Sequence, residues 1–184
     1  MPKLVDLIRH GQSTFNAACT EAGSDPLHYD ARLTPLGHAQ VAAARAMLGA
    51  TKYDLVVTTP FSRAVETALG LFGAADVPIL VEALHRERLE SSCDIGRSKA
   101  ELARDFPNLV FDHLDDPWWH DCAEKNALGH AIEPEEVFIV RVHDFRRWLM
   151  ARPEPRIAVI GHGTFFRYLT GVPLANCEVL RWSP

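Results

Sequence analysis

The chain reads Leu7-Ile8-Arg9-His10-Gly11-Gln12-Ser13-Thr14-Phe15-Asn16 near its amino terminus. The apolar run over residues 4–8 predicts a buried strand, which delivers a cation, Arg9, and an imidazole, His10, onto a glycine turn. A guanidinium is a planar fork that matches phosphate oxygens, and a neutral imidazole can act as a nucleophile. Gly11 lets the backbone turn tightly and approach a ligand closely. The stretch therefore predicts anion chemistry at the end of a buried strand.

Strand-like and helical patterns alternate along the chain. The predicted strands are the apolar runs at 3–8, 54–58, 78–81 and 156–160. The predicted helices, where apolar residues recur at spacings of three and four, cover 35–48, 62–72 and 135–150. Thr34 is expected to cap the first helix, and Pro35 to occupy its first position. This alternation predicts a single α/β domain over 1–184 with a mostly parallel sheet.

Chemically active side chains follow three of the predicted strands. Arg9 and His10 follow the first, Arg63 lies just beyond the second, and His162 follows the last. Because ligands bind at the carboxyl ends of strands in open parallel sheets, these side chains are expected to converge on one site. Ser62 is expected to cap the helix that begins beside it, so that the helix N-terminus favours a bound anion.

The region 85–134 differs from the rest of the chain because it is polar and rich in Asp and His. It predicts an excursion above the strand ends, with a short helix near 97–106. Two interpretations of Trp118 and Trp119 stay open: stacking on an organic part of a substrate, or packing in the core or lid. Further on, 178–182 predicts an edge strand that can pair with a second copy, which offers a route to a homodimer.

Four segments in order carry a family resemblance. The first is Arg9 to Asn16, and the others are Leu33-Thr34-Pro35-Leu36-Gly37 with Gln40, Thr59-Pro60-Phe61-Ser62-Arg63-Ala64-Val65-Glu66-Thr67-Ala68, and Gly161-His162-Gly163. Together they resemble the histidine phosphatase superfamily, which includes the cofactor-dependent phosphoglycerate mutases. The resemblance covers the chain from about residue 3 to about residue 171. It implies a three-layer α/β/α sandwich with a mostly parallel central sheet, in which 85–134 is a lid-like insertion that covers the site and shapes substrate choice.

The resemblance also implies catalytic roles. His10 is the expected nucleophile, which attacks phosphorus to form a phosphohistidine. Arg9, Arg63 and His162 are the expected donors to the equatorial oxygens of the phosphoryl transition state, and Asn16 is a further donor. The glycines on both sides of His162 permit close approach of the backbone to a ligand. Neither a metal nor another cofactor is expected.

The family uses a carboxylic acid to protonate the leaving oxygen, and three glutamates are candidates: Glu82, Glu87 and Glu90. Glu87 fits the family pattern best, because that pattern is a Leu, a short spacer, a Glu and a later glycine. Crowding by a phosphate dianion is expected to raise the pKa of this carboxyl group, so that it keeps its proton until it donates it. Glu90 stays open as the alternative acid. Glu66 lies one turn from Arg63, which favours an ion pair or a surface role.

The polar insertion also raises the question of a metal site. Its candidate ligands are His113, Asp115, Asp116, His120, Asp121, Cys122 and His130. Their spacings match no standard zinc site, so a polar lid in contact with substrate or water is preferred and no metal is expected. The four cysteines, at 19, 93, 122 and 177, form no CxxC pair and predict no disulfide framework.

Composition narrows the class of partner. The formal net charge of −5 argues against nucleic acid, and no run approaches the ~20 apolar residues that a membrane span needs. A mildly acidic protein that binds a dianion must concentrate its positive charge in one pocket. The expected partner is therefore a small phosphorylated molecule, and the lack of a signal-peptide pattern favours the cytoplasm.

Hydrolysis is the expected reaction. The phosphoglycerate mutases carry Glu-Arg-His-Tyr-Gly after the acid, whereas this chain has Glu87-Arg88-Leu89-Glu90-Ser91, and its 184 residues leave no room for the extra mutase segments. The resemblance thus implies a histidine acid phosphatase-like phosphoric monoester hydrolase that acts on a small metabolite. Two alternatives stay open: a mutase-type phosphotransferase, and a non-catalytic protein that binds a phosphorylated ligand on the same fold.

Overall fold

A five-stranded sheet runs through the part of the chain that the structure, a computed structural model, describes: residues 3–22 and 24–183. Its strands are β1 (Leu4–Arg9), β2 (Leu55–Thr58), β3 (Ile79–Val81), β4 (Arg156–Gly161) and β5 (Val179–Trp182). In space they follow the order β3-β2-β4-β1-β5. The first four strands pair in parallel, and β5 runs antiparallel to β1 at the sheet edge. The mostly parallel sheet and the edge strand expected at 178–182 are confirmed.

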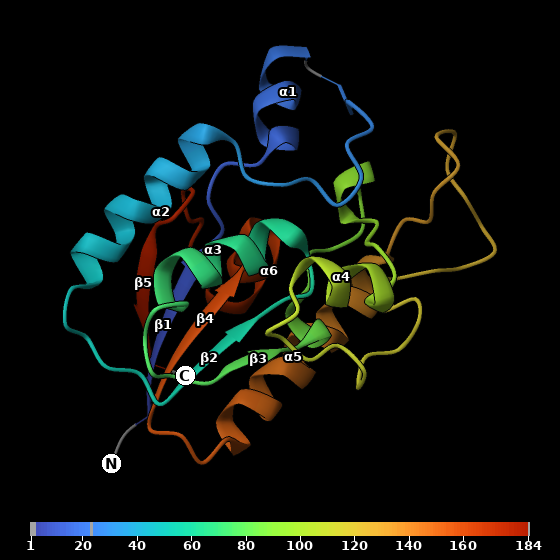
Figure 1. The fold of residues 1–184 in the computed structure, drawn as a ribbon. Helices are drawn as coiled ribbons and strands as arrows, with labels where there is room; N and C mark the ends of the chain where they lie inside the picture. The colour runs from blue at the N-terminus through green and yellow to red at the C-terminus, as the bar shows by residue number, and fades with distance from the viewer. Residues whose placement is uncertain (1–2, 23, 184) are drawn as a thin grey trace.

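Helices cover both faces of this sheet (Figure 1). The α-helices are α1 (Thr14–Ala22), α2 (Pro35–Leu48), α3 (Ser62–Phe72), α4 (Lys99–Asp105), α5 (Glu135–Ala151) and α6 (Gly163–Thr170). Successive strand residues point to opposite faces. In β1, Leu7 packs with residues of α5 and α6, whereas Ile8 packs with residues of α2 and α3. This arrangement is the three-layer α/β/α sandwich that the resemblance implied.

Local signals place several helices as expected. Thr34 Oγ1 accepts a hydrogen bond from the Gly37 N–H at 3.0 Å, and Pro35 is the first residue of α2. The helices expected at 62–72 and 135–150 are α3 and α5. Neither α1 nor α6 is predicted by periodicity, because both are short, with nine and eight residues. Among the described helices, none is both long and apolar enough to cross a membrane.

The region 85–134 contains little regular structure. The 3-10 helix η1 (Ala83–His85) leads into it, η2 (Ser92–Asp94) follows, and the short helix expected near 97–106 is α4. Figure 1 shows much of this region on the side to which the arrowheads of β2 and β4 point. The region thus lies near the carboxyl ends of the central strands. Its action as a lid stays a prediction.

Trp118 belongs to a third apolar cluster, which packs the region after α4 against the start of α3. It is 3% exposed, and its ring meets Phe61 edge-on with the centroids 4.7 Å apart. Its indole Nε1–H donates to the carbonyl of Arg97 at 2.9 Å. The packing interpretation therefore holds for this tryptophan.

Candidate active site

Two neighbouring parallel strands bring the two predicted histidines together. His10 follows β1 and His162 follows β4, and their ring centroids lie 5.3 Å apart. The backbone of His10 is held on both sides, because its N–H donates to Gly161 O at 3.0 Å and its carbonyl accepts from Asn176 Nδ2 at 2.9 Å. The convergence at the carboxyl ends of the strands that the sequence predicts is thus present.

One hydrogen bond sets the tautomer of His10. Its Nδ1 lies 2.7 Å from the carbonyl oxygen of Gly11. Since a carbonyl can only accept, Nδ1 carries the hydrogen and Nε2 keeps a lone pair in the neutral ring. Burial lowers the pKa of His10 well below its usual value, and the nearby charges of Arg63 and Arg9 lower it further. The site therefore holds a neutral imidazole with a nucleophilic Nε2.

His162 and Arg9 each keep a buried nitrogen without a hydrogen-bond partner among the residues described. For His162 this atom is Nδ1, because Nε2 lies 2.7 Å from the hydroxyl of Thr59. For Arg9 it is Nε, while Nη1 donates to Leu174 O at 2.8 Å. Burial, followed by the charge of Arg63, lowers the pKa of His162 well below its usual value. Both nitrogens are therefore open to a further hydrogen bond.

Arg63 is the second residue of α3 and is buried. Its Nη1 donates to Cys93 O at 2.6 Å, and its Nη2 pairs with Asp94 Oδ1 at 3.0 Å. The guanidinium also lies over the ring of Phe61, 4.3 Å from the centroid. Sequence reasoning missed Asp94. Its only sequence signal is an acidic residue in the segment after the predicted acid, which is too general to single it out.

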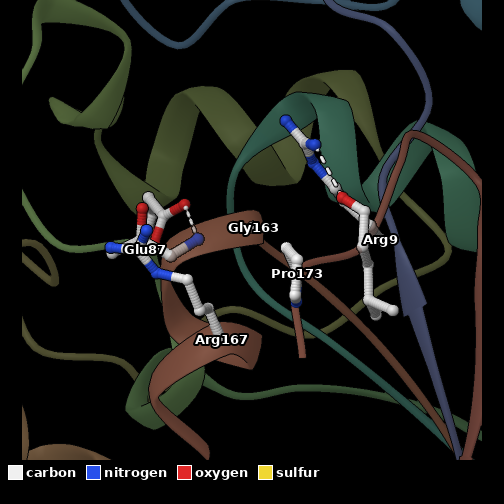
Figure 2. Close-up of a pocket in the computed structure, with 7 residues that line it drawn as sticks. Arg9, Glu87, Gly163, Arg167 and Pro173 are labelled. Atoms are coloured by element: carbon white, nitrogen blue, oxygen red, sulfur yellow. Dashed lines mark hydrogen bonds between the residues drawn. The ribbon is translucent and has the colours of Figure 1, made fainter. Parts of the chain in front are cut away.

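Glu87 lies against the start of α6 (Figure 2). Its Oε2 accepts from the N–H of Thr164 and its Oε1 from that of Phe165, both at 2.9 Å. Burial, followed by the negative charge of Asp94, raises the pKa of Glu87 to about 7, against the opposing effect of the Thr164 N–H. The group can therefore hold a proton near neutral pH, as a general acid must.

The other two candidate acids are placed differently. Glu90 pairs with Arg88 at 3.0 Å and keeps 47% of its side chain exposed. Glu82 accepts a hydrogen bond from the N–H of Leu84 and so caps η1. Glu87 therefore fits the role of the acid better than the half-exposed Glu90 or than Glu82, whose carboxylate caps a 3-10 helix.

Arg9, His10, Arg63 and Glu87 line one cavity of about 160 Å³. Its walls are formed by Arg9, His10, Ser13, Phe15, Asn16, Arg63, Glu87, Arg88, Glu90, Ser91, Cys93, Asp94 and Thr164. Asn16 accepts a hydrogen bond from the N–H of Ser13 through Oδ1 at 3.1 Å. His162 does not line this cavity, since it is fully buried behind His10. The structure therefore gathers five of the six predicted site residues on the wall, with the sixth in contact with them.

One local expectation beside the site is wrong. Ser62 does not cap α3, because it is the first residue of the helix and Phe61 occupies the cap position. The cap comes from Asp30, which accepts from the N–H of Ser62 at 2.8 Å and from its hydroxyl at 2.6 Å. A carboxylate from a distant loop thus replaces the local hydroxyl, and it is the stronger acceptor.

Glu66 forms the ion pair that the sequence left open, although not with Arg63. Its Oε1 pairs with Arg32 at 2.9 Å, and its Oε2 accepts from the N–H of Leu33 at 2.9 Å. This carboxylate therefore fixes the chain before α2 and takes no part in the cavity.

The motif glycines make room for protein groups. A Cβ on Gly11 would lie 2.8 Å from the carbonyl oxygen of Gly37. A Cβ on Gly161 would lie 2.7 Å from the ring of Phe166, and one on Gly163 would lie 3.2 Å from the guanidinium of Arg9. The close approaches that the sequence attributes to a ligand are thus made here to backbone, to an aromatic ring and to the guanidinium of Arg9.

The polar residues considered as metal ligands do not gather into a site. Among the residues described, no group of three His, Cys, Asp or Glu side chains is arranged to hold a metal ion. His113 instead hydrogen-bonds through Nε2 to the carbonyl of Val81 at 2.8 Å.

Comparison with known proteins identifies the family. The model of the histidine phosphatase superfamily (branch 1) matches residues 5–182. A phosphoglycerate mutase-like protein of Arabidopsis thaliana is 29% identical over 228 residues, which cover 96% of this chain and 82% of the relative. A glucosyl-3-phosphoglycerate phosphatase of Mycolicibacterium vanbaalenii is 25% identical over 178 residues, which cover 95% of this chain and 77% of the relative.

A solved structure shares the fold. It is that of a mycobacterial glucosyl-3-phosphoglycerate phosphatase in complex with VO3, with a TM-score of 0.61 at 20% identity. The match covers 96% of this chain and 89% of that one. Because the family model spans nearly the whole chain, this protein belongs to branch 1 of the histidine phosphatase superfamily.

Proposed function

We propose that the protein is a metal-independent phosphatase that hydrolyses the phosphomonoester of a small metabolite through a phosphohistidine on His10. The single observation that carries the proposal is the 2.7 Å contact between His10 Nδ1 and the carbonyl of Gly11, in a buried ring whose pKa is lowered. Together these leave a neutral Nε2 as the nucleophile in a cavity with two arginines.

In the first step, Nε2 of His10 attacks phosphorus and forms the N–P bond. The bond between phosphorus and the ester oxygen breaks, and its electron pair goes to the leaving oxygen. Glu87 gives its proton to that oxygen. Arg9 and Arg63 donate to the equatorial phosphoryl oxygens, where the negative charge is spread in the transition state. His162 does not line the cavity in this structure, so it acts as a third donor only after its ring moves toward the phosphoryl group; its Nδ1 carries the hydrogen when the Thr59 hydroxyl donates to Nε2.

In the second step, water attacks the phosphohistidine. Glu87, now ionised, accepts a proton from that water as the new P–O bond forms. The N–P bond breaks and returns the lone pair to Nε2 of His10, and inorganic phosphate leaves. Glu87 thus regains its proton, and the site returns to its starting state.

The choice of hydrolysis over phosphoryl transfer rests on sequence and relatives. The mutase-type Glu-Arg-His-Tyr-Gly is replaced by Glu87-Arg88-Leu89-Glu90-Ser91. Several relatives are named phosphatases, among them glucosyl-3-phosphoglycerate phosphatases and a 2-carboxy-D-arabinitol-1-phosphatase of Triticum aestivum. The cavity of about 160 Å³ suits a phosphoryl group with a small organic part.

The test is a hydrolysis assay with p-nitrophenyl phosphate and a panel of phosphorylated metabolites, in the presence of EDTA. We expect turnover by the natural chain and a loss of at least about 100-fold in His10→Ala, because no nucleophile is left. His38→Ala, at an exposed position of α2, is the matched control and keeps its activity.

Three outcomes contradict the proposal. Activity that disappears in EDTA contradicts the metal-independent mechanism. Equal activity in His10→Ala contradicts the phosphohistidine. If no compound is hydrolysed, the phosphatase proposal is wrong, and the better interpretation is a mutase or a protein that only binds the phosphorylated ligand.

A further inference from the structure

A short turn after Glu87 presents an acidic side chain to Arg63. Asp94 ends η2 and is 5% exposed. Its Oδ1 lies 3.0 Å from Arg63 Nη2, while its Oδ2 accepts from the N–H of Ser91 at 3.2 Å. The carbonyl of Cys93 accepts from Nη1 of Arg63 at 2.6 Å. The turn therefore offers a carboxylate and a carbonyl side by side to both ends of one guanidinium.

This contact fixes an arginine that is expected to bind phosphate. Arginine has a long side chain, and ordering it costs conformational entropy each time it engages a ligand. Arg63 is already ordered by Asp94, by Cys93 and by the ring of Phe61 beneath it. A guanidinium has five N–H donors, and Asp94 and Cys93 use two of them. The others stay available for phosphoryl oxygens, so the donor is preorganised.

The same turn places a second buried carboxyl group in the cavity of Glu87. Asp94 contacts a guanidinium, whereas the carboxylate of Glu87 accepts hydrogen bonds from the backbone N–H groups of Arg88, Thr164 and Phe165. Burial raises the pKa of Asp94 as well, but the contact with the Arg63 guanidinium opposes that rise. When two carboxyl groups share a site, the one paired with the cation keeps the charge more readily and the other keeps the proton. The proton therefore stays on the group that faces the leaving oxygen.

Other charged groups also act on Glu87. They are Arg9 from β1, Arg63 from α3, Arg167 from α6, Arg88 and Glu90 from its own segment, and Asp94 from η2. Arg9, Arg63, Arg88 and Arg167 favour the ionised carboxylate, and Asp94 and Glu90 oppose it. Of the two acidic groups, Asp94 is the buried one, so its charge is the less screened by solvent.

We propose that Asp94 is a positioning residue of the reaction, which fixes the Arg63 guanidinium for phosphate and directs the acidic proton of the site to Glu87. The inference deepens the proposed function, because it assigns a role in the same two steps. Asp94 itself touches neither phosphorus nor the leaving oxygen in this scheme.

The test is Asp94→Asn, which keeps the shape of the side chain and an oxygen for Arg63 but removes the charge. We expect kcat/KM for an alkyl phosphate to fall about 10-fold or more, and its alkaline limb to move about 1 pH unit lower. The alkaline limb moves to lower pH because the loss of the negative charge of Asp94 favours the ionised form of Glu87 and so lowers the pKa of Glu87. Asp112→Asn, at an exposed position, is the control and leaves the profile unchanged.

A second measurement is independent of turnover. In a protein with 13C-labelled glutamate, the carboxyl signal of Glu87 is the one that disappears in Glu87→Gln. We expect its titration midpoint to fall by about 1 pH unit in Asp94→Asn. An unchanged midpoint in the folded variant overturns the inference. If the natural chain hydrolyses nothing, the proposed function fails, and this titration still decides the role of Asp94.

Discussion

At the scale of single residues, the proposed acid, Glu87, and the proposed nucleophile, His10, owe their protonation states to different causes. His10 is neutral because burial and two arginines disfavour its cation. Glu87 holds its proton because burial and a neighbouring carboxylate disfavour its anion. The two shifts move in opposite directions, which is how environments separate the pKa values of catalytic groups. Both groups are consequently ready for the first step near neutral pH.

This separation predicts the pH profile. Glu87 must be protonated to act, and its pKa is about 7, so kcat/KM for an alkyl phosphate falls as pH rises above about 7. His10 produces no acid limb near pH 6.5, because its pKa lies well below that value. The measurement is kcat/KM from pH 5 to 9. An acid limb near pH 6.5 contradicts the prediction if it arises from a group of the enzyme and not from ionisation of the substrate.

Substitution distinguishes the two glutamates that the sequence left open. Glu87→Gln is expected to lower kcat/KM for alkyl phosphates by about 100-fold or more and to remove the alkaline limb. The same substitution lowers kcat/KM for p-nitrophenyl phosphate much less, because nitrophenolate leaves without a proton. Glu90→Gln is the matched control, since Glu90 lines the same cavity. If Glu90→Gln shows the loss and Glu87→Gln does not, Glu90 is the acid.

At the scale of elements, α5 holds the segment that carries the acid. Arg141 on this helix donates to the carbonyls of Leu84 and Arg86, at 3.0 and 2.7 Å. It also pairs with the fully buried Glu133 at 2.5 Å. Because the guanidinium is a rigid fork, this one side chain holds both the segment before Glu87 and the segment around Glu133 against the helix. The position of Glu87 thus depends on a helix that supplies no residue to the cavity.

Arg141→Lys tests this dependence. An ammonium keeps the charge beside Glu133 but cannot reach all the acceptors, so we expect the free energy of unfolding to fall by about 1–3 kcal/mol. We also expect a larger loss of kcat with alkyl phosphates than with p-nitrophenyl phosphate. Urea denaturation and the two assays measure these effects, with the exposed Arg146→Lys on the same helix as control. Equal losses on both substrates exclude a role in placing the acid.

At the scale of the whole molecule, the site depends on how closely the first loop approaches α2. A Cβ on Gly37 would lie 2.2 Å from the carbonyl oxygen of Gln12, next to Gly11. Real Cβ atoms do not come so close, and backbone cannot give way as a side-chain tip does. The loop that carries the nucleophile is therefore held by close contact with a helix from another part of the chain.

Gly37→Ala is consequently expected to displace this loop. We expect the free energy of unfolding to fall by about 1–3 kcal/mol and activity to fall with it. Thermal unfolding and the p-nitrophenyl phosphate assay measure both effects. Ala42→Ser, at an exposed position of the same helix, is the control. A variant as stable and active as the natural chain shows that the loop can relax without cost.

The sequence by itself determined the elements whose signals are local. Continuous apolar runs predicted the four parallel strands, and apolar residues at spacings of three and four predicted α2, α3 and α5. The Thr34 cap needs only a residue three positions away. The motif residues Arg9, His10, Arg63 and His162 lie where strands and helices meet, so the topology of an α/β sheet was enough to predict their convergence.

Only the tertiary structure decided how these groups are partnered. Asp30 displaces Ser62 as the cap of α3, Asp94 meets Arg63, and Glu87 lies against α6. Each contact joins segments 31 to 77 positions apart in the chain. No local pattern encodes such a pair, because its geometry and its burial exist only after the layers have packed. The protonation states of the site depend on that burial and therefore on the fold as a whole.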